Sequence, residues 1–466
     1  MAEVKVVLSP VMASADAEHA EMGVEITVKN MQIRKGETLF STYDSMLPRS
    51  FCCKKFNDFI EPMQLSDEEG TLETVKETDD QYYTINGIYK AARDTKGAIR
   101  IAYKVNCAAV GLNPVFDLGY EYGGLHGSGY TFMPAFPEGK YTYDLFWDLS
   151  GMPYGSIGAW AYGEGNVHVE NKEGEALMDT FYACGLLNRV KFNNFGYYWF
   201  EGKEMLTVAA ETSQIFDYES KFFKDEGEPY NIFIRKTLLP EHRVGGTAAE
   251  RSYGAVYAEG NFLGREWLDL LFAHEMVHNW VHLDDTPFGT CTWYVEGMAE
   301  FYGALLPWRA GVADEKMVCR ELNMRAHAWY ENPARHTSNA DLNGKMMQGG
   351  ETGRIQYGRG YFYMTHADEM IRRATNNEKC LDDLVLALNE KFKADKHIKN
   401  EAWIEEYGKL VGTDVAKKEF DEMAGGAEIT PSAAAYEGKI KLVAEKGTER
   451  GTEKETTLWQ FVPTEE

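Results

Sequence analysis

One short motif limits what this chain can fold into more than any other feature. Residues 274–278 read His-Glu-Met-Val-His and lie inside an apolar segment, 265–282, whose pattern has the period of a helix. The two imidazoles are four residues apart, so they share one face of that helix and can present two nitrogens to one metal ion. A chain of this composition contains such a motif by chance only about 0.02 times. The sequence therefore predicts a metal site built on a helix.

A catalytic zinc site takes three protein ligands and leaves one position open. Glu296 follows His278 after seventeen residues, near the start of the next helical pattern, and an antiparallel helix can return it to the metal. Glu300 lies one turn further on the same face, where it can hydrogen-bond a ligand histidine. Glu275, next to His274, can take a proton from a water that the metal activates. The alternative for Glu296 and Glu300 is that both are ordinary solvated acids.

Other histidines and the cysteines offer weaker candidates. His282 extends the face of His278 by four residues, but it points further along the helix axis, and we expect it outside the ligand set. The thiols are widely spread, odd in number and without a Cys-x-x-Cys pair: Cys52, Cys53, Cys107, Cys184, Cys291, Cys319 and Cys380. We expect them to be buried thiols in a reducing compartment. This favours a cytoplasmic location, whereas a signal peptide removed before residue 1 would make the protein a secreted one.

The charge of the chain excludes some classes of partner. Acidic residues number 73 against 48 basic ones, and the formal net charge is −25. A surface of this sign repels phosphate backbones and anionic lipids, so we expect neither nucleic acid nor a membrane as partner. The continuous apolar runs, such as 384–388, are also far shorter than a membrane-spanning helix. No feature of the sequence indicates the oligomeric state.

The 466 residues are enough for several domains. Within residues 1–170, apolar and polar residues alternate as they do in β-strands, which predicts a sandwich-like domain. After that the period changes, and the sequence predicts helices at 175–187, 205–224, 265–282, 292–306, 314–329, 360–374 and 381–392, with strands at 190–200 and 231–238. The predicted organisation is a β-rich domain at 1–170, a catalytic domain at 171–310, a helical domain at 311–430 and a tail at 431–466. The apolar end of the tail, 458–462, is either a docking strand or a frayed end.

The residues around the motif resemble the gluzincin metallopeptidases. The resemblance rests on Asn279-Trp280 after the second histidine, and on the run Trp293-x-x-Glu296-Gly297-x-x-Glu300-Phe301-Tyr302. The catalytic core is similar to the aminopeptidase N family, while the β-rich front half and the size are more like the glycyl aminopeptidase family. The aminopeptidase N family usually has eighteen residues before the ligand glutamate, and this chain has seventeen, which shifts a loop without removing a ligand. The resemblance implies an α+β multidomain protein with a thermolysin-like catalytic domain, and one zinc ion on His274, His278 and Glu296.

Two further segments carry the resemblance. The stretch Gln356-Tyr357-Gly358-Arg359-Gly360 resembles the Tyr-x-Lys-Gly stretch of the aminopeptidase N family, which implies that Tyr357 donates to the oxyanion of the reaction. The alternative is a core tyrosine at the start of a helix.

The segment that begins at Gly245 and Gly246 occupies the place of the family's edge strand, to which a peptide substrate can pair. Ala248 stands where the family has the glutamate that binds the substrate's amino group. Glu250 is displaced from that position by two residues, which keeps it on the same face of a strand.

The implied function is hydrolysis of peptide bonds by a zinc-activated water, with aminopeptidase action first. Because of Ala248, an endopeptidase with the same zinc site is the close alternative. A branch of the aminopeptidase N family opens epoxides with the same ligands, so a non-peptide substrate is a further alternative. A binding module without catalysis is disfavoured, because such a relative could lose Glu275 or a ligand at no structural cost. The side-chain preference and the natural substrate do not follow from the sequence, and cobalt or manganese could occupy similar nitrogen and oxygen ligands.

Overall fold

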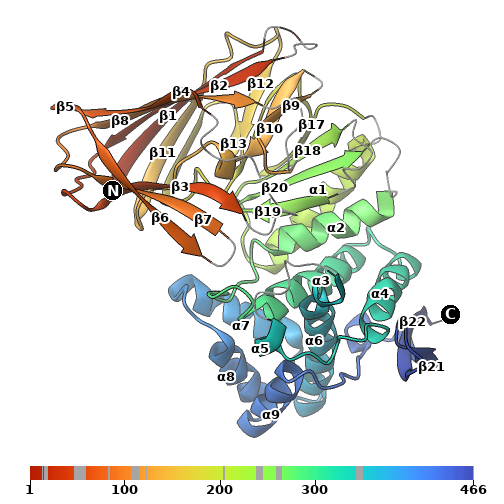
Figure 1. The fold of residues 1–466 in the computed structure, drawn as a ribbon. Helices are drawn as coiled ribbons and strands as arrows, with labels where there is room; N and C mark the ends of the chain where they lie inside the picture. Colours follow the sequence, from red (N-terminus) through yellow and green to blue (C-terminus); the bar gives the residue numbers. More distant parts are fainter. Residues whose placement is uncertain are drawn as a thin grey trace. The chain divides into compact units, whose positions relative to one another are not determined.

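A computed structural model describes residues 1–12, 14, 19–46, 59–81, 84–107, 115–121, 123–202, 205–237, 245–258, 265–342 and 350–464. The chain is a mixed α+β protein with two compact units (Figure 1). The first unit comprises Met1–Ser213 and Gly227–Leu263, and the second comprises Gln214–Glu226 and Gly264–Glu466. The four-part division predicted from the sequence stays a prediction.

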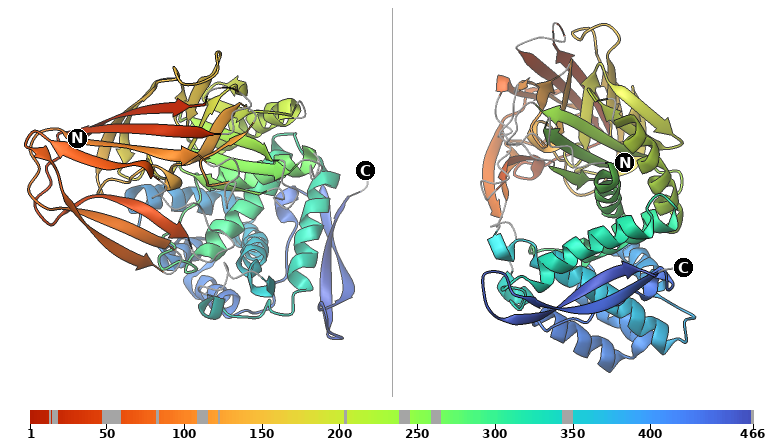
Figure 2. Two further views of the ribbon diagram at one scale, coloured as in Figure 1. Left: turned by 45° about the horizontal axis from the view of Figure 1, so that its top comes forward. Right: turned by 90° about the vertical axis from the view of Figure 1, so that its right-hand side faces the viewer.

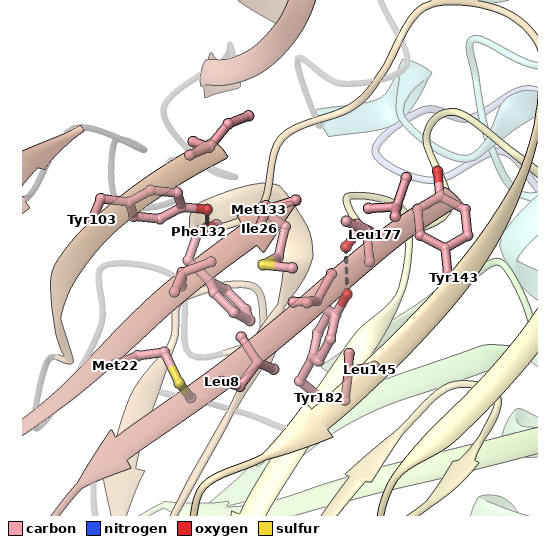
Figure 3. Packing of buried hydrophobic residues seen from close by; sticks show 14 of the residues in the cluster. Leu8, Met22, Ile26, Tyr103, Phe132, Met133, Tyr143, Leu145, Leu177 and Tyr182 are labelled. Atoms are coloured by element: carbon pink, nitrogen blue, oxygen red, sulfur yellow. Dashed lines mark hydrogen bonds between the residues drawn. The ribbon is translucent and has the colours of Figure 1, made fainter. Parts of the chain in front are cut away.

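The first unit contains a seven-stranded sheet in the order β14-β11-β1-β2-β8-β4-β5. These strands are Val167–Glu173, Lys140–Trp147, Ala2–Val11, Ala20–Lys29, Ile99–Cys107, Phe59–Asp67 and Gly70–Thr71. Buried and more exposed residues alternate along β1, β2 and β8, which confirms the pattern seen in the sequence. The buried side chains, among them Leu8, Met22 and Ile26, form the core that Figure 3 shows. Two tyrosines in this core bond their hydroxyls to the backbone: Tyr103 donates to the carbonyl oxygen of Phe132 at 2.6 Å, and Tyr182 to that of Leu177 at 2.8 Å.

The first unit also contains two smaller sheets. One has the order β13-β12-β15-β10-β9, with strands Gly163–Glu164, Ile157–Trp160, Phe181–Gly185, Gly124–Ser128 and Gly119–Glu121. The other has the order β3-β7-β6, with strands Thr38–Met46, Thr84–Ala91 and Thr74–Gln81.

The helix predicted at 175–187 is wrong, because β15 occupies its second half. Every residue of β15 is buried and the strand lies in the middle of its sheet, so its apolar residues run continuously instead of alternating. A short continuous apolar run cannot be distinguished from a buried helix by its period.

The last sheet of the first unit has the order β16-β17-β18-β20-β19. Its strands are Asn188–Phe192, Phe195–Trp199, Tyr230–Thr237, Ser252–Ala258 and Gly245–Ala249. The strand predicted at 190–200 is a hairpin, with Asn193 in the left-handed conformation at its turn. Helix α1 (Met205–Phe222) connects the parallel strands β17 and β18, as the change of period predicted. Strand β19 is antiparallel to β20 and lies at the edge of the sheet.

The second unit is mostly helical. Its helices are α2 (Arg265–Val277), α3 (Thr292–Arg309), α4 (Glu315–Tyr330), α5 (Asn339–Leu342), α6 (Ile355–Ala374), α7 (Leu381–Ala394), α8 (Asn400–Val411) and α9 (Thr413–Ala424). The helices predicted within this unit are all present, although α2 ends five residues earlier than expected and α6 begins five residues earlier. Asp314 accepts a hydrogen bond from the backbone N–H of Met317 and so caps α4.

The end of the chain folds as a hairpin of β21 (Ile440–Thr448) and β22 (Glu455–Pro463), shown in dark blue in Figure 2. The side chain of Asn323 on α4 bonds both the N–H and the carbonyl of Phe461. Among the described cysteines, Cys107, Cys184, Cys291 and Cys319 are buried free thiols and Cys380 is partly buried. Cys52 and Cys53 lie outside the described residues. None of the described helices combines the length and the apolar character needed to cross a bilayer.

Candidate metal centre

Helices α2 and α3 come unusually close beside the motif. A Cβ added at Gly303 on α3 would lie 2.7 Å from Cα and 2.8 Å from N of His274. These are backbone atoms that cannot move aside, so only glycine allows this approach. Glu296 and Glu300 precede Gly303 by seven and three residues and therefore lie on the same face of α3. The local sequence of α3 thus brings both carboxylates to the histidines of α2.

Three donor atoms meet between these helices. The Nε2 atoms of His274 and His278 are 3.2 Å apart, and Oε2 of Glu296 is 3.5 Å from the first and 3.6 Å from the second. Four-coordinate zinc with bonds of about 2.0–2.1 Å places its donor atoms about 3.3–3.4 Å apart. Within the described part of the chain, this is the group of three metal-ligating side chains that is compact enough to hold an ion.

One oxygen of the Glu296 carboxylate also lacks a hydrogen-bond partner. Its Oε2 atom is buried and makes no hydrogen bond. A buried oxygen without a partner is costly, and a bound cation would satisfy it. The donor set, its spacing and this oxygen all fit one zinc ion.

The two imidazoles differ in their electrostatic surroundings. Burial disfavours the charged form of His274, but the carboxylates of Glu300 and Glu296 outweigh it and raise its pKa. Burial is also the largest effect on His278, and there it lowers the pKa despite the charge of Glu296. His278 is therefore a neutral nitrogen donor. A metal that binds to both residues must displace a proton from His274.

Glu300 lies behind His274, as the spacing predicted. Its Oε1 is 3.7 Å from Nδ1 of His274, and its other oxygen pairs with Nε of Arg325 on α4. Burial opposes ionisation of Glu300, but the guanidinium of Arg325 outweighs it, so the pKa of the carboxyl is lowered. Sequence reasoning missed Arg325. Its only local signal is Glu321 four residues earlier, a spacing typical of exposed pairs on helix surfaces.

Tyr357 reaches the centre from α6, because α6 crosses α3 in close contact. The contact is made by two glycines: a Cβ added at Gly297 would lie 2.5 Å from Cα of Gly360. The ring of Tyr357 lies parallel to the imidazole of His274, with centroids 6.4 Å apart. Burial, followed by the charge of Glu296, raises the pKa of Tyr357 well above its ordinary value, so the phenol keeps its proton at neutral pH.

The charge of Glu275 acts on the same phenol. Glu275 is half-buried on α2, next to His274. His282, which we expected outside the ligand set, stacks on the ring of Phe392 with centroids 5.1 Å apart.

The residues predicted to bind substrate lie in the first unit. Gly245 and Gly246 form the start of β19, and a Cβ at Gly246 would overlap the ring of Tyr253. The strand ends at Ala249, so Glu250 begins the turn and the argument from alternating side chains does not extend to it.

The backbone N–H of Glu250 donates to the carbonyl oxygen of Asp179 at 2.9 Å. Burial raises the pKa of Asp179 to about 7, and the charges of Glu175 and Glu250 add to this, although the hydroxyl of Tyr130 acts against it. Glu250 thus belongs to an acidic surface of the first unit.

A family model matches the segment that contains the metal centre. Residues 268–346 match the M61 glycyl aminopeptidase family. The match includes His274, His278, Glu296, Glu300 and Arg325, and it ends before Tyr357. No protein with a curated description matches the sequence.

Solved structures with a similar fold include an aminopeptidase N family protein, an M1 zinc metallopeptidase and a leukotriene A4 hydrolase. An aminopeptidase N family protein from Idiomarina loihiensis has a TM-score of 0.69 at 14% identity, over 95% of this chain and 79% of that chain. An M1 zinc metallopeptidase from Deinococcus radiodurans has a TM-score of 0.53 at 13% identity, over 92% and 94%. Leukotriene A4 hydrolase from Saccharomyces cerevisiae has a TM-score of 0.56 at 11% identity, over 92% and 68%. The chain therefore has the fold of these three proteins, and its segment 268–346 resembles the glycyl aminopeptidase family, as the motifs around His274 and Glu296 predicted.

Proposed function

We propose that the chain is a zinc-dependent aminopeptidase in which His274, His278 and Glu296 hold one zinc ion. The observation that carries this proposal is the spacing of the three donor atoms, 3.2, 3.5 and 3.6 Å, around a buried carboxylate oxygen without a hydrogen bond. The match to the glycyl aminopeptidase family over the same segment supports it.

When bound, zinc would polarise the scissile carbonyl and lower the pKa of a water molecule. Glu275, adjacent to His274, is the general base that takes the proton of the attacking water and returns it to the leaving nitrogen. Tyr357, whose raised pKa keeps it protonated, donates a hydrogen bond to the oxyanion that develops on the substrate carbonyl. The negative charge of Glu300, with Oε1 3.7 Å from Nδ1 of His274, favours a proton on Nδ1, so that Nε2 keeps its lone pair for the metal.

The proposal extends to the domains and to the substrate. It assigns a β-sandwich-like domain to 1–170, a thermolysin-like catalytic domain to 171–310 and a helical domain to 311–430. A peptide would pair with the edge strand at Gly245 and Gly246 by β-addition. The neighbouring carboxylates of Glu250 and Glu175 would attract its amino group. The M1 peptidase of Deinococcus radiodurans has been solved with the substrate Tyr-Ser-Ala, which agrees with a peptide ligand for this fold.

The test compares one peptide with a free and with an acetylated N-terminus, and mass spectrometry identifies the products. The zinc-loaded protein should remove residues only from the free peptide, and Glu275→Gln should abolish this. Glu390→Gln is the matched control, because Glu390 lies on the surface of α7 and pairs with Lys393 at 2.9 Å. Cleavage that persists in Glu275→Gln, or a protein that binds no zinc, would contradict the proposal.

The second candidate is an endopeptidase with the same centre. It is favoured by Ala248, whose side chain offers no group to bind an amine, and by the position of Glu250 beyond the end of the strand. Internal cleavage of both peptides would support it. If zinc stays bound and neither peptide is cut, a non-peptide substrate of the epoxide type takes the place of both.

A further inference from the structure

The side chain of Arg325 is buried on α4 between groups from three helices. Its Nε pairs with Glu300 on α3, and its Nη1 lies 3.3 Å from Oε1 of Glu321 on its own helix. Its guanidinium lies over the ring of Tyr361 on α6, 6.0 Å from the centroid. Only 14% of the side chain of Arg325 and 12% of that of Glu300 is exposed, so water contributes little to holding either charge.

The guanidinium of Arg325 forms its hydrogen bond with Glu300 and not with Glu321, which is closer in sequence. Nη1 is buried and makes no hydrogen bond, although Glu321 is four residues away on the same helix face. The hydrogen bond of Arg325 to Glu300 instead joins α4 to α3. An arginine needed only to stabilise α4 would be satisfied by Glu321 alone.

We propose that Arg325 is a positioning residue for the metal ligand His274, and this inference rests on the proposed zinc centre. The two oxygens of a carboxylate are rigidly joined. When Arg325 holds one oxygen of Glu300, the other oxygen stays directed at Nδ1 of His274, 3.7 Å away. That contact sets the orientation of the imidazole, and with it the direction of Nε2 toward the metal.

Without the guanidinium, Glu300 would lose both its counter-ion and its fixed orientation. Residues that orient a metal-bound histidine typically change metal affinity by about 10- to 100-fold when they are removed. We expect a loss of that size in Arg325→Met. Arg325→Lys should lose less, because an ammonium keeps the charge but cannot reproduce the planar geometry of the pair.

The experiment measures zinc affinity by chelator competition on the metal-free full-length protein, and the visible spectrum of the cobalt-substituted protein. Arg325→Met should weaken zinc by about 10- to 100-fold and change the cobalt spectrum. Glu321→Gln is the matched control, since it removes the other carboxylate from the same guanidinium and leaves Glu300 in place. Its zinc affinity and cobalt spectrum should stay close to those of the wild type.

Equal zinc affinity in Arg325→Met and the wild type overturns the proposal, as does an equal loss in Glu321→Gln. Circular dichroism shows whether each variant is folded. If Arg325→Met does not fold, the comparison of Arg325→Lys with Glu321→Gln decides in the same way. Zinc binding is measured without turnover, so a wild type that binds zinc but cuts no peptide refutes the peptidase alone. A wild type that binds no zinc refutes both proposals.

Discussion

Gly360→Ala tests whether the position of Tyr357 depends on the crossing of α3 and α6. A Cβ at Gly360 would overlap the carbonyl oxygen of Trp293 and would lie 2.7 Å from Cα of Gly297. Ordinary van der Waals contact begins at 3.4 Å, so the helices must separate by at least about 0.7 Å. The clashing atoms belong to the backbone, and no change of rotamer can relieve them.

The separation acts directly on Tyr357, which precedes Gly360 by three residues on α6. Overpacking of this kind costs about 1–3 kcal/mol of stability. A misplacement of about 1 Å near a reacting group can cost about 10²-fold in rate. We therefore expect kcat to fall by about 10- to 100-fold, or about 1.4–2.7 kcal/mol of activation free energy. The zinc donors lie on the α2 and α3 side of the contact, so the zinc content should stay at one ion.

The assay is steady-state hydrolysis of a peptide with a free N-terminus by Gly360→Ala, Tyr357→Phe and the double variant, with zinc measured by mass spectrometry. Gly358→Ala is the control on the same helix, because the nearest atoms to its Cβ belong to the side chain of Trp329, at 3.0 Å or more, and not to a backbone. Both alanines gain the same helix propensity. The reasoning is refuted if Gly360→Ala lowers kcat by the same factor in the Tyr357→Phe variant as in the wild type. It is also refuted if Gly360→Ala and Gly358→Ala lower kcat equally.

Three further predictions concern stability. Glu219 on α1 is fully buried with no hydrogen bond to either oxygen, and burial raises its pKa well above the ordinary value. The unfolded chain loses this proton above about pH 4.5 while the folded protein keeps it, so the site should lower stability by about 1.4 kcal/mol per pH unit as pH rises toward the folded pKa. Glu219→Gln should flatten the pH dependence of urea unfolding, and an unchanged slope would contradict the assignment.

Arg335 pairs with Glu449 of the C-terminal hairpin at 2.8 Å, and both side chains are only 4% exposed. Arg335→Met should cost about 3 kcal/mol in urea unfolding. Arg450→Met, which removes a pair at 3.5 Å with both side chains largely exposed, should cost less than about 1 kcal/mol. Equal costs would show that burial does not decide the strength of these pairs. Finally, zinc at about 100 times its Kd should stabilise the metal-free protein by about 2.7 kcal/mol in calorimetry. A His274→Ala, His278→Ala variant should show no such gain, and a gain equal to that of the wild type would place the zinc elsewhere.

Local spacing explains why the centre could be found in advance. His274 and His278 are one helical turn apart, and a helix places such residues on one face whatever surrounds it. Glu296 and Glu300 follow the same rule on α3. The alternating strands of the first unit and the apolar period of α3, α4 and α6 are likewise local patterns. The ends of α3 and α4 were predicted within three residues, and those of α6 within five.

The failures are cases in which neighbours in space decide the outcome. Phe181–Gly185 is buried on both faces because other parts of the fold cover both sides of its sheet there, a fact that its own residues do not carry. Glu250 lies beyond the end of β19, because that strand pairs with β20 only as far as Ala249.

The sequence by itself predicted the chemistry proposed for the protein: which side chains bind a metal, which carboxylate acts as base, and that two helices carry them. Only the tertiary structure decided how these helices meet. The glycine contacts Gly303 with His274 and Gly297 with Gly360 set the separation of the donors and of Tyr357. The structure also supplied Arg325, which reaches Glu300 from a third helix. Spacing along one helix is dictated by its hydrogen bonds, whereas the approach of two helices depends on which side chains are missing between them.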